Sequence, residues 1–139
     1  MATLTQREYI LVVDDDRNML ELLRRHLAAQ GFEVLTVSGV VEAIEILKMI
    51  PIDLVVTDLK MPKASGLDLV KYIQEHFGNT EVIMVTGYAT LLRALEATKT
   101  GAGGYLLKPF TEEELLALVR HVFNKLRNRR TAPAQSPLV

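Results

Sequence analysis

The 139-residue sequence contains no cysteine, which excludes disulfide bonds, zinc sites built on thiolates and cysteine nucleophiles. Its three histidines, His26, His76 and His121, are scattered, so no histidine-based metal cluster is expected. No run of about eighteen apolar residues is present, and the N-terminal stretch MATLTQREYI lacks the basic start and apolar core of a secretory signal. We therefore expect a cytoplasmic protein that makes no contact with membranes and binds any metal through oxygen ligands.

Acidic residues are missing from the last part of the chain. From Leu115 onward the sequence holds none of its 17 acidic residues but five of its 16 basic ones, namely Arg120, Lys125, Arg127, Arg129 and Arg130. We interpret these as the solvated end of a helix, because cations are favourable near a helix C-terminus. A nucleic-acid surface is the alternative interpretation. Aromatic residues that would stack on bases are rare in this stretch, so direct nucleic-acid binding is not expected.

The length and hydropathy of the chain predict a single folded domain. A sequence of 139 residues that is 49% hydrophobic is long enough for one core and too short for two ordinary domains. We place this domain at residues 1–128. Residues 129–139 include Pro133 and Pro137, and we interpret them as a flexible tail or the start of a linker to a further domain that the sequence lacks.

Apolar runs typical of strands alternate with apolar residues at helical spacing along the whole chain. The pattern predicts strands at residues 9–13, 32–37, 52–57, 81–85 and 105–107, and helices at 18–30, 41–48, 67–76, 91–100 and 111–130. The last helix shows Leu115, Leu118, Val119, Val122 and Leu126 on one face. Such alternation predicts an α/β fold with a parallel sheet, right-handed crossovers and helices on both faces.

Polar side chains follow four of the predicted strands. They are Asp14, Asp15 and Asp16 after the first strand, Asp58 after the third, Thr86 and Gly87 after the fourth, and Lys108 and Pro109 after the fifth. The carboxyl ends of parallel strands meet at one edge of the sheet, and ligands bind at that edge. We therefore expect these groups to form one site.

Three of the acidic residues at this edge predict a metal site. Asp14, Asp15 and Asp58 would repel one another unless a divalent cation neutralised them, and an all-oxygen ligand set suits Mg²⁺. Asp16 stands where the N-cap of the following helix belongs, so we assign it a capping role. Thr111, followed by Glu114, predicts a capping box at the start of the last helix.

The remaining groups at this edge predict phosphoryl transfer. Lys108 supplies a positive charge for an oxyanion, Thr86 a hydroxyl, and Gly87 an accessible backbone. Together with a metal and a carboxylate nucleophile they provide the positioning and charge that transfer of a phosphoryl group requires.

Four sequence fragments carry a family resemblance. LVVDDD, DLVVTDLKMPKASGLDL, VIMVTGYA and GGYLLKPF occur in this order at the ends of the first, third, fourth and fifth strands. Over residues 8–126 the chain resembles the receiver domain of a two-component response regulator. The resemblance implies a doubly wound (βα)5 fold of the flavodoxin-like, CheY-like kind, a three-layer sandwich whose parallel sheet has the strand order 2-1-3-4-5.

The resemblance assigns roles to the acidic residues. Asp58 matches the family's phosphoacceptor, which receives a phosphoryl group from a phosphohistidine of a sensor histidine kinase or phosphotransfer protein. Asp15 and Asp58 match direct Mg²⁺ ligands, together with the backbone carbonyl of Lys60, while Asp14 would act through water. Met61, Pro62 and Gly66 match the loop that follows the phosphoacceptor.

The resemblance also assigns a switch. Lys108 matches the lysine that contacts the phosphoryl group, and Thr86 the hydroxyl that moves to bind it. Tyr105 matches the aromatic residue that turns inward when Thr86 shifts, and Lys108 with Pro109 matches a cis-peptide turn. Phosphorylation is then expected to change the face made by the fourth helix, fifth strand and fifth helix, which is also the face expected for a homodimer.

Lys60 and Tyr88 each stand two residues after a predicted site residue. We expect both side chains to lean over the phosphoryl group, exclude water and slow its hydrolysis; the alternative is that both point into solvent.

Two other functions compete with a signalling switch. An aspartate-nucleophile phosphatase usually has a second acid two residues after the nucleophile, but Lys60 stands there and the chain has no inserted cap. A non-phosphorylated docking module of the same fold would not need the complete set of acid, threonine and lysine. We therefore expect no conventional enzyme. The sequence does not identify the output. We interpret the chain as a piece of a longer regulator, such as a regulator of transcription, with a free-standing protein as the alternative.

Overall fold

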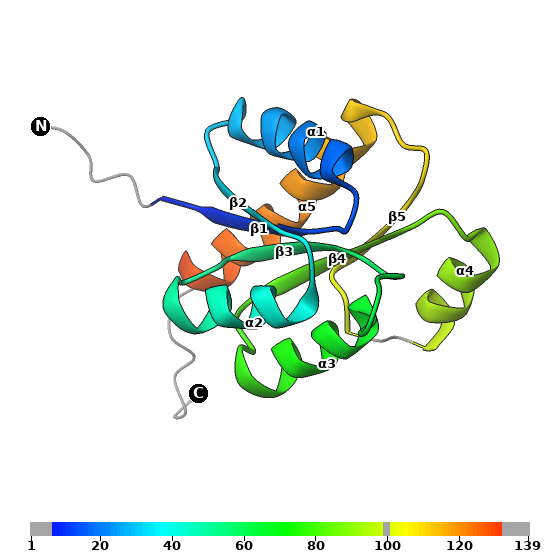
Figure 1. The fold of residues 1–139 in the computed structure, drawn as a ribbon. Coiled ribbons are helices and arrows are strands. Elements are labelled where there is room, and N and C mark those ends of the chain that lie inside the picture. The colour runs from blue at the N-terminus through cyan, green and yellow to red at the C-terminus, as the bar shows by residue number, and fades with distance from the viewer. Residues whose placement is uncertain (1–6, 99–100, 132–139) are drawn as a thin grey trace, which may run out of the picture.

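The computed structural model describes residues 7–98 and 101–131. Within them, five strands alternate with five helices as the apolar periodicity predicts. The chain order is β1 (Tyr9–Val13), α1 (Arg17–Ala28), β2 (Glu33–Val37), α2 (Val40–Met49), β3 (Leu54–Asp58), α3 (Gly66–His76), β4 (Glu81–Thr86), α4 (Ala89–Thr98), β5 (Gly104–Leu107) and α5 (Glu112–Thr131). All strand pairings are parallel and the sheet order is β2-β1-β3-β4-β5, which confirms the predicted fold (Figure 1).

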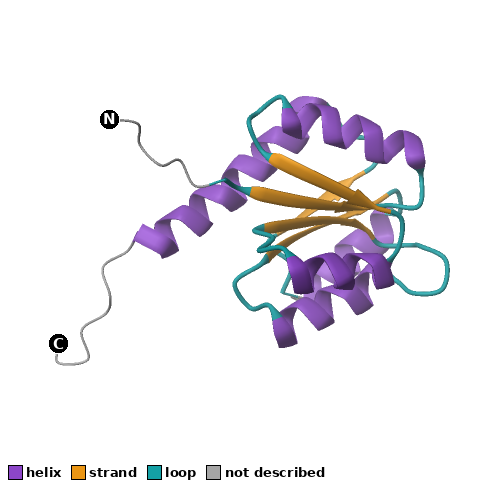
Figure 2. Cartoon of the chain, turned by 60° about the vertical axis from the view of Figure 1, so that its left-hand side comes forward, coloured by secondary structure: helices purple, strands orange, loops and turns teal. Residues whose placement is uncertain are grey.

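Two apolar clusters fill the space between the sheet and its helices. Helices α1 and α5 cover one face and α2, α3 and α4 the other, which gives the three layers of Figure 2. Successive residues of a strand point to opposite faces, so Val12 packs in one cluster and Val13 in the other. The central strands β1 and β3 are consequently apolar almost throughout, as expected for a parallel sheet buried on both faces.

The core face of α5 extends beyond the residues that the periodicity predicts. Phe123 is fully buried and stacks on Phe32, with ring centroids 4.7 Å apart, although neither residue belonged to the predicted stripe.

Among the described residues, no helix combines the length and apolar character needed to cross a bilayer.

The predicted helix starts are confirmed by their capping contacts. The Asp16 carboxylate accepts the N–H of Asn18 at 2.9 Å, which makes Asp16 the N-cap of α1. Thr111 and Glu114 exchange two hydrogen bonds of 2.9 and 3.0 Å between side chain and backbone, forming the capping box.

Helix ends differ from the prediction by a few residues. α1 ends two residues early, at Ala28, because the chain tightens into a turn before Gly31, which has a φ of 98°. α5 continues to Thr131, one residue past the predicted helix end at 130, and so crosses the domain boundary proposed after residue 128. Residues 132–139, the rest of the predicted tail or linker, and residues 99–100, the predicted end of the fourth helix, lie outside the described residues.

Candidate functional site

The carboxyl ends of β1 and β3 bring three carboxylates together. Asp14 and Asp15 directly follow β1, and Asp58 is the last residue of β3. One carboxylate oxygen of each lies within 4.8 Å of the others. Asp14 is buried, Asp58 is half-buried and Asp15 is exposed, so the cluster opens toward solvent on the side of Asp15.

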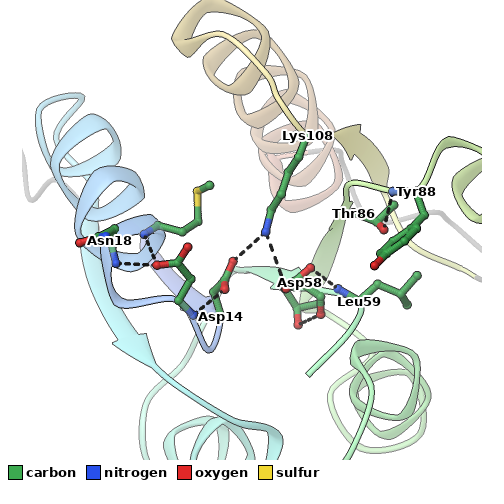
Figure 3. A network of polar contacts seen from close by, with 10 residues as sticks. Asp14, Asn18, Asp58, Leu59, Thr86, Tyr88 and Lys108 are labelled. Atoms are coloured by element: carbon green, nitrogen blue, oxygen red, sulfur yellow. Dashed lines mark hydrogen bonds and ion pairs between the residues drawn. The ribbon is translucent and has the colours of Figure 1, made fainter. Parts of the chain in front are cut away.

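Lys108 reaches into this cluster from the end of β5 (Figure 3). Its Nζ donates to Asp14 Oδ2 at 3.2 Å and lies 3.6 Å from Asp58 Oδ2. The backbone N–H of Lys108 donates to the carbonyl of Thr86 at 2.8 Å, which ties the end of β5 to the end of β4. The Lys108–Pro109 peptide bond is cis.

The surroundings of Asp58 disfavour its negative charge. Burial raises the pKa of Asp58 above its usual value, Lys108 lowers it, and the neighbouring Asp14 and Asp15 raise it. The Asp58 Oδ1 atom accepts the backbone N–H of Leu59 at 2.9 Å, which favours the carboxylate. The Leu59 contact was not predicted, because a backbone amide leaves no signal in residue type.

The carboxylate cluster fits a divalent cation. The single ammonium of Lys108 contacts Asp14 and Asp58 in a cluster of three carboxylates, so the group has a surplus of negative charge. Burial raises the pKa of Asp58, and the neighbouring carboxylates add to that rise. A cation with oxygen ligands would relieve that surplus, and Mg²⁺ prefers such ligands.

The loop after Asp58 packs tightly against the strand end. A Cβ atom at Gly66 would lie 2.3 Å from the Asp58 carbonyl oxygen, so only glycine fits there without a shift of the backbone. The N–H of Gly66 donates to the carbonyl of Leu59 at 2.8 Å, and Thr57 Oγ1 donates to the Asp58 carbonyl at 2.9 Å. These contacts fix the backbone that presents the Asp58 carboxylate. Met61 is partly buried and Pro62 is exposed in the same loop.

Thr86, Tyr88 and Lys60 form a second group beside the carboxylates. Thr86 is buried, and its hydroxyl accepts the N–H of Tyr88 at 3.2 Å (Figure 3). The Lys60 ammonium lies 4.2 Å from the centroid of the Tyr88 ring, a cation–π contact that joins the loops after β3 and β4. The contact itself was not predicted, since the sequence indicated only that both side chains lie near the site.

Tyr105 stands apart from the carboxylates. It lies in β5 opposite Met84 of β4, and its partly buried side chain packs against the apolar cluster under α2, α3 and α4. The structure thus brings Asp14, Asp15, Asp58 and Lys108 together and places Tyr105 between the sheet and its helical cover.

Comparison with known proteins decides the family. The model of the response regulator receiver domain matches residues 10–120. The chain belongs to the response regulator receiver family. This receiver domain is 40% identical over 122 residues to the response regulator protein PilR of Pseudomonas aeruginosa, covering 88% of the chain. It spans only 27% of the length of PilR, so it corresponds to about a quarter of that relative.

Solved structures agree with the fold of this receiver domain. A receiver domain from Clostridium thermocellum is 37% identical and superposes with a TM-score of 0.79 over 86% of this chain and 97% of its own. The response regulator protein TrrA from Thermotoga maritima, in complex with Mg²⁺-BeF, is 31% identical with a TM-score of 0.74, covering 83% of this chain and 98% of its own. The relatives are named regulators, so the family role is regulation in two-component signalling.

Proposed function

We propose that this receiver domain is a switch in which Asp58 accepts a phosphoryl group from a phosphohistidine of a sensor histidine kinase or phosphotransfer protein. The observation that carries the proposal is that Asp58 lies beside both Lys108 and the Asp14–Asp15 pair at the edge of the sheet where the strands end. In the transfer, an Asp58 carboxylate oxygen bonds to phosphorus as the phosphorus–nitrogen bond breaks, and that electron pair returns to the imidazole.

Residues of this chain provide the ligands for Mg²⁺. The Asp15 and Asp58 carboxylates and the Lys60 carbonyl would hold the ion directly, and Asp14 would hold it through water. When bound, the ion neutralises charge on the carboxylates and on the transferring phosphoryl oxygens. The solved complex of TrrA with Mg²⁺-BeF supports Mg²⁺ as the ion in a chain of the same family.

The conformational readout is proposed for the α4–β5–α5 face. Phosphorylation adds roughly −1.5 to −2 charges and three acceptor oxygens beside Lys108 and Thr86. Inverting a two-state population from 1:99 to 99:1 takes about 5.5 kcal/mol of differential interaction. Movement of Thr86 toward the phosphoryl group would let Tyr105 turn inward, and the partly exposed Leu107 would help this face bind a partner or a second copy.

A surface for the phosphoryl donor adjoins the carboxylates. Lys108 also lines an apolar hollow of about 370 Å³, together with Met19, Leu22, Pro109 and Phe110. Leu22 is 42% exposed, so an apolar side chain of the donor protein would bury it while the phosphohistidine reaches Asp58.

The cytoplasmic location of the switch stays a prediction.

The test of the proposal is the intact mass of the wild-type chain after incubation with acetyl phosphate or phosphoramidate. We expect a gain of one phosphoryl group in Mg²⁺ and no gain in EDTA. An equal gain with and without Mg²⁺ would contradict the metal assignment. No gain under either condition would favour the docking module.

The contact between Lys60 and Tyr88 predicts a long-lived phosphoryl group. A Lys60→Ala/Tyr88→Ala variant removes the bulk that would exclude water, and we expect phosphate loss about tenfold faster, as a barrier reduction of about 1.4 kcal/mol would give. The measurement is the decay of radiolabel after removal of the donor. Lys63→Ala, an exposed lysine in the same loop, is the control and should leave the decay unchanged. Equal decay in the double variant and the wild type would show that these side chains do not protect the group.

A further inference from the structure

The edge of the sheet where the strands begin carries a row of acidic side chains. Glu8 precedes β1, Asp53 precedes β3 and Glu81 opens β4. Each forms an ion pair with an arginine near the end of α5. The pairs are Arg127 with Glu8, Arg129 with Glu81 and Arg130 with Asp53, each with a nitrogen–oxygen distance of 2.6 Å. We call these three pairs the arginine clasp.

Arg127 is held on two sides. Its Nε and Nη2 atoms donate to the two oxygens of Glu8 at 2.9 and 2.6 Å, a bidentate geometry that fixes the plane of the guanidinium. The hydrogen bonds that Arg127 donates to Glu8 raise the pKa of Arg127 above its usual value. The guanidinium carbon lies 5.5 Å from the ring centroid of Phe123, which is fully buried.

The other two pairs use carboxylates that are largely shielded from solvent. Asp53 accepts Arg130 Nη2 on one oxygen at 2.6 Å and the N–H of Tyr9 on the other at 2.8 Å, so one carboxylate joins β1, β3 and α5. Glu81 reaches Arg129 past Gly103, where a Cβ atom would lie only 2.4 Å from Glu81 Oε1.

Apolar burial does not extend to the end of α5. Leu126 is the last buried residue of the helix, and residues 127–131 are all exposed. A helix end without packing frays readily, because most helical stability in proteins comes from tertiary contacts. Within the described part of the chain, the ionic contacts of the clasp are what tie this last turn to the sheet.

We propose that the arginine clasp is a positioning device that holds the last turn of α5 against the sheet and sets the direction in which the chain leaves the domain. Figure 2 shows this end of α5 running out on the side where the strands begin. The clasped strands β1, β3 and β4 lead at their other ends to Asp14, Asp58 and Thr86. The direction in which the chain leaves α5 is therefore fixed relative to the strands that build the phosphoryl site, whether or not Asp58 is phosphorylated.

Amide hydrogen exchange tests the proposal without any phosphorylation. Arg129→Gln/Arg130→Gln removes two clasp pairs, and we expect the amides of residues 129–131 to exchange about tenfold faster. The matched control, Arg120→Gln/Lys125→Gln, removes two exposed charges from the same helix that form no ion pair within the described residues, and its exchange should equal that of the wild type. Equal exchange in both variants and the wild type, or equal acceleration in both variants, would overturn the proposal.

A nitroxide label reports how firmly the helix end is held. The chain has no cysteine, so Thr131→Cys gives one labelling site. We expect an immobilised label in the wild-type and control backgrounds and a mobile label in the clasp variant. The charge swap Glu81→Arg/Arg129→Glu should restore immobility relative to Arg129→Glu alone. A label equally mobile in every background would contradict the clasp. If circular dichroism shows that Arg129→Gln/Arg130→Gln does not fold, the single variant Arg129→Gln takes its place and is judged by the same criteria.

Discussion

Asp58→Asn is expected to abolish the gain of a phosphoryl group from acetyl phosphate in Mg²⁺. Asparagine keeps the size of the side chain and an oxygen that can accept the Leu59 N–H, but it removes the nucleophile and its negative charge. The remaining carboxylates, Asp14 and Asp15, follow a different strand. We therefore expect at least a hundredfold slower modification, equivalent to about 2.7 kcal/mol in the barrier. The measurement is intact mass against time.

Asp16→Asn is the matched control for this loss. Asp16 is also an acid after β1, but its carboxylate caps α1, and asparagine caps helices about as well. The control should therefore gain a phosphoryl group at the rate of the wild type. A gain in Asp58→Asn at the wild-type rate would move the acceptor to another residue, which peptide mapping would locate.

Addition of Mg²⁺ is expected to raise the melting temperature of the wild type. The ion binds the folded state, in which the three carboxylates converge, and at a free concentration ten times its Kd it adds about 1.4 kcal/mol. For a domain of this size that corresponds to a rise of about 5 °C. Asp58→Asn lacks one ligand and should rise much less. No rise in the wild type would show that the cluster binds no metal.

In EDTA, the difference in melting temperature between the wild type and Asp58→Asn is expected to depend on pH. Because burial and the neighbouring acids raise the pKa of Asp58 in the folded state, folding favours its protonated form. The contribution of Asp58 to the free energy of unfolding therefore falls as the pH rises from the pKa of this group in the unfolded state through its pKa in the folded state. Acidification restores that contribution. Asp58→Asn should not show this fall, and its melting temperature in EDTA at neutral pH should exceed that of the wild type. A lower melting temperature for Asp58→Asn at neutral pH would contradict the electrostatic cost of Asp58.

The carboxylate cluster could be predicted because strand ends are local features of the sequence. Apolar runs locate β1 and β3, and a parallel sheet brings Asp14 and Asp58 to one edge whatever the detailed packing. The same logic predicted Lys108 at the end of β5. The backbone amide of Leu59 and the contact between Lys60 and Tyr88 depend on loop conformation, which periodicity does not describe.

The basic end of α5 shows where local reasoning fails. The sequence indicated a solvated helix end, and Arg127, Arg129 and Arg130 are exposed, but it did not indicate that they pair with acids 119, 48 and 77 residues away in the chain. These arginines and acids form no motif in the sequence, and only the parallel sheet brings Glu8, Asp53 and Glu81 to one edge. Phe123 escaped prediction similarly, because its partner Phe32 lies on a distant segment.

The two edges of the sheet carry separate sets of charged residues. A five-residue strand such as β3 spans about 16 Å, far more than the contact distances within either site, so each carboxylate interacts mainly with the arginine or lysine beside it. Substitutions among the acids and arginines of the clasp are therefore expected to change the direction in which the chain leaves the domain and to leave the phosphoryl chemistry intact. A fusion that grafts a new domain after Thr131 would inherit its orientation from Glu8, Asp53 and Glu81, and that orientation becomes a quantity that can be engineered.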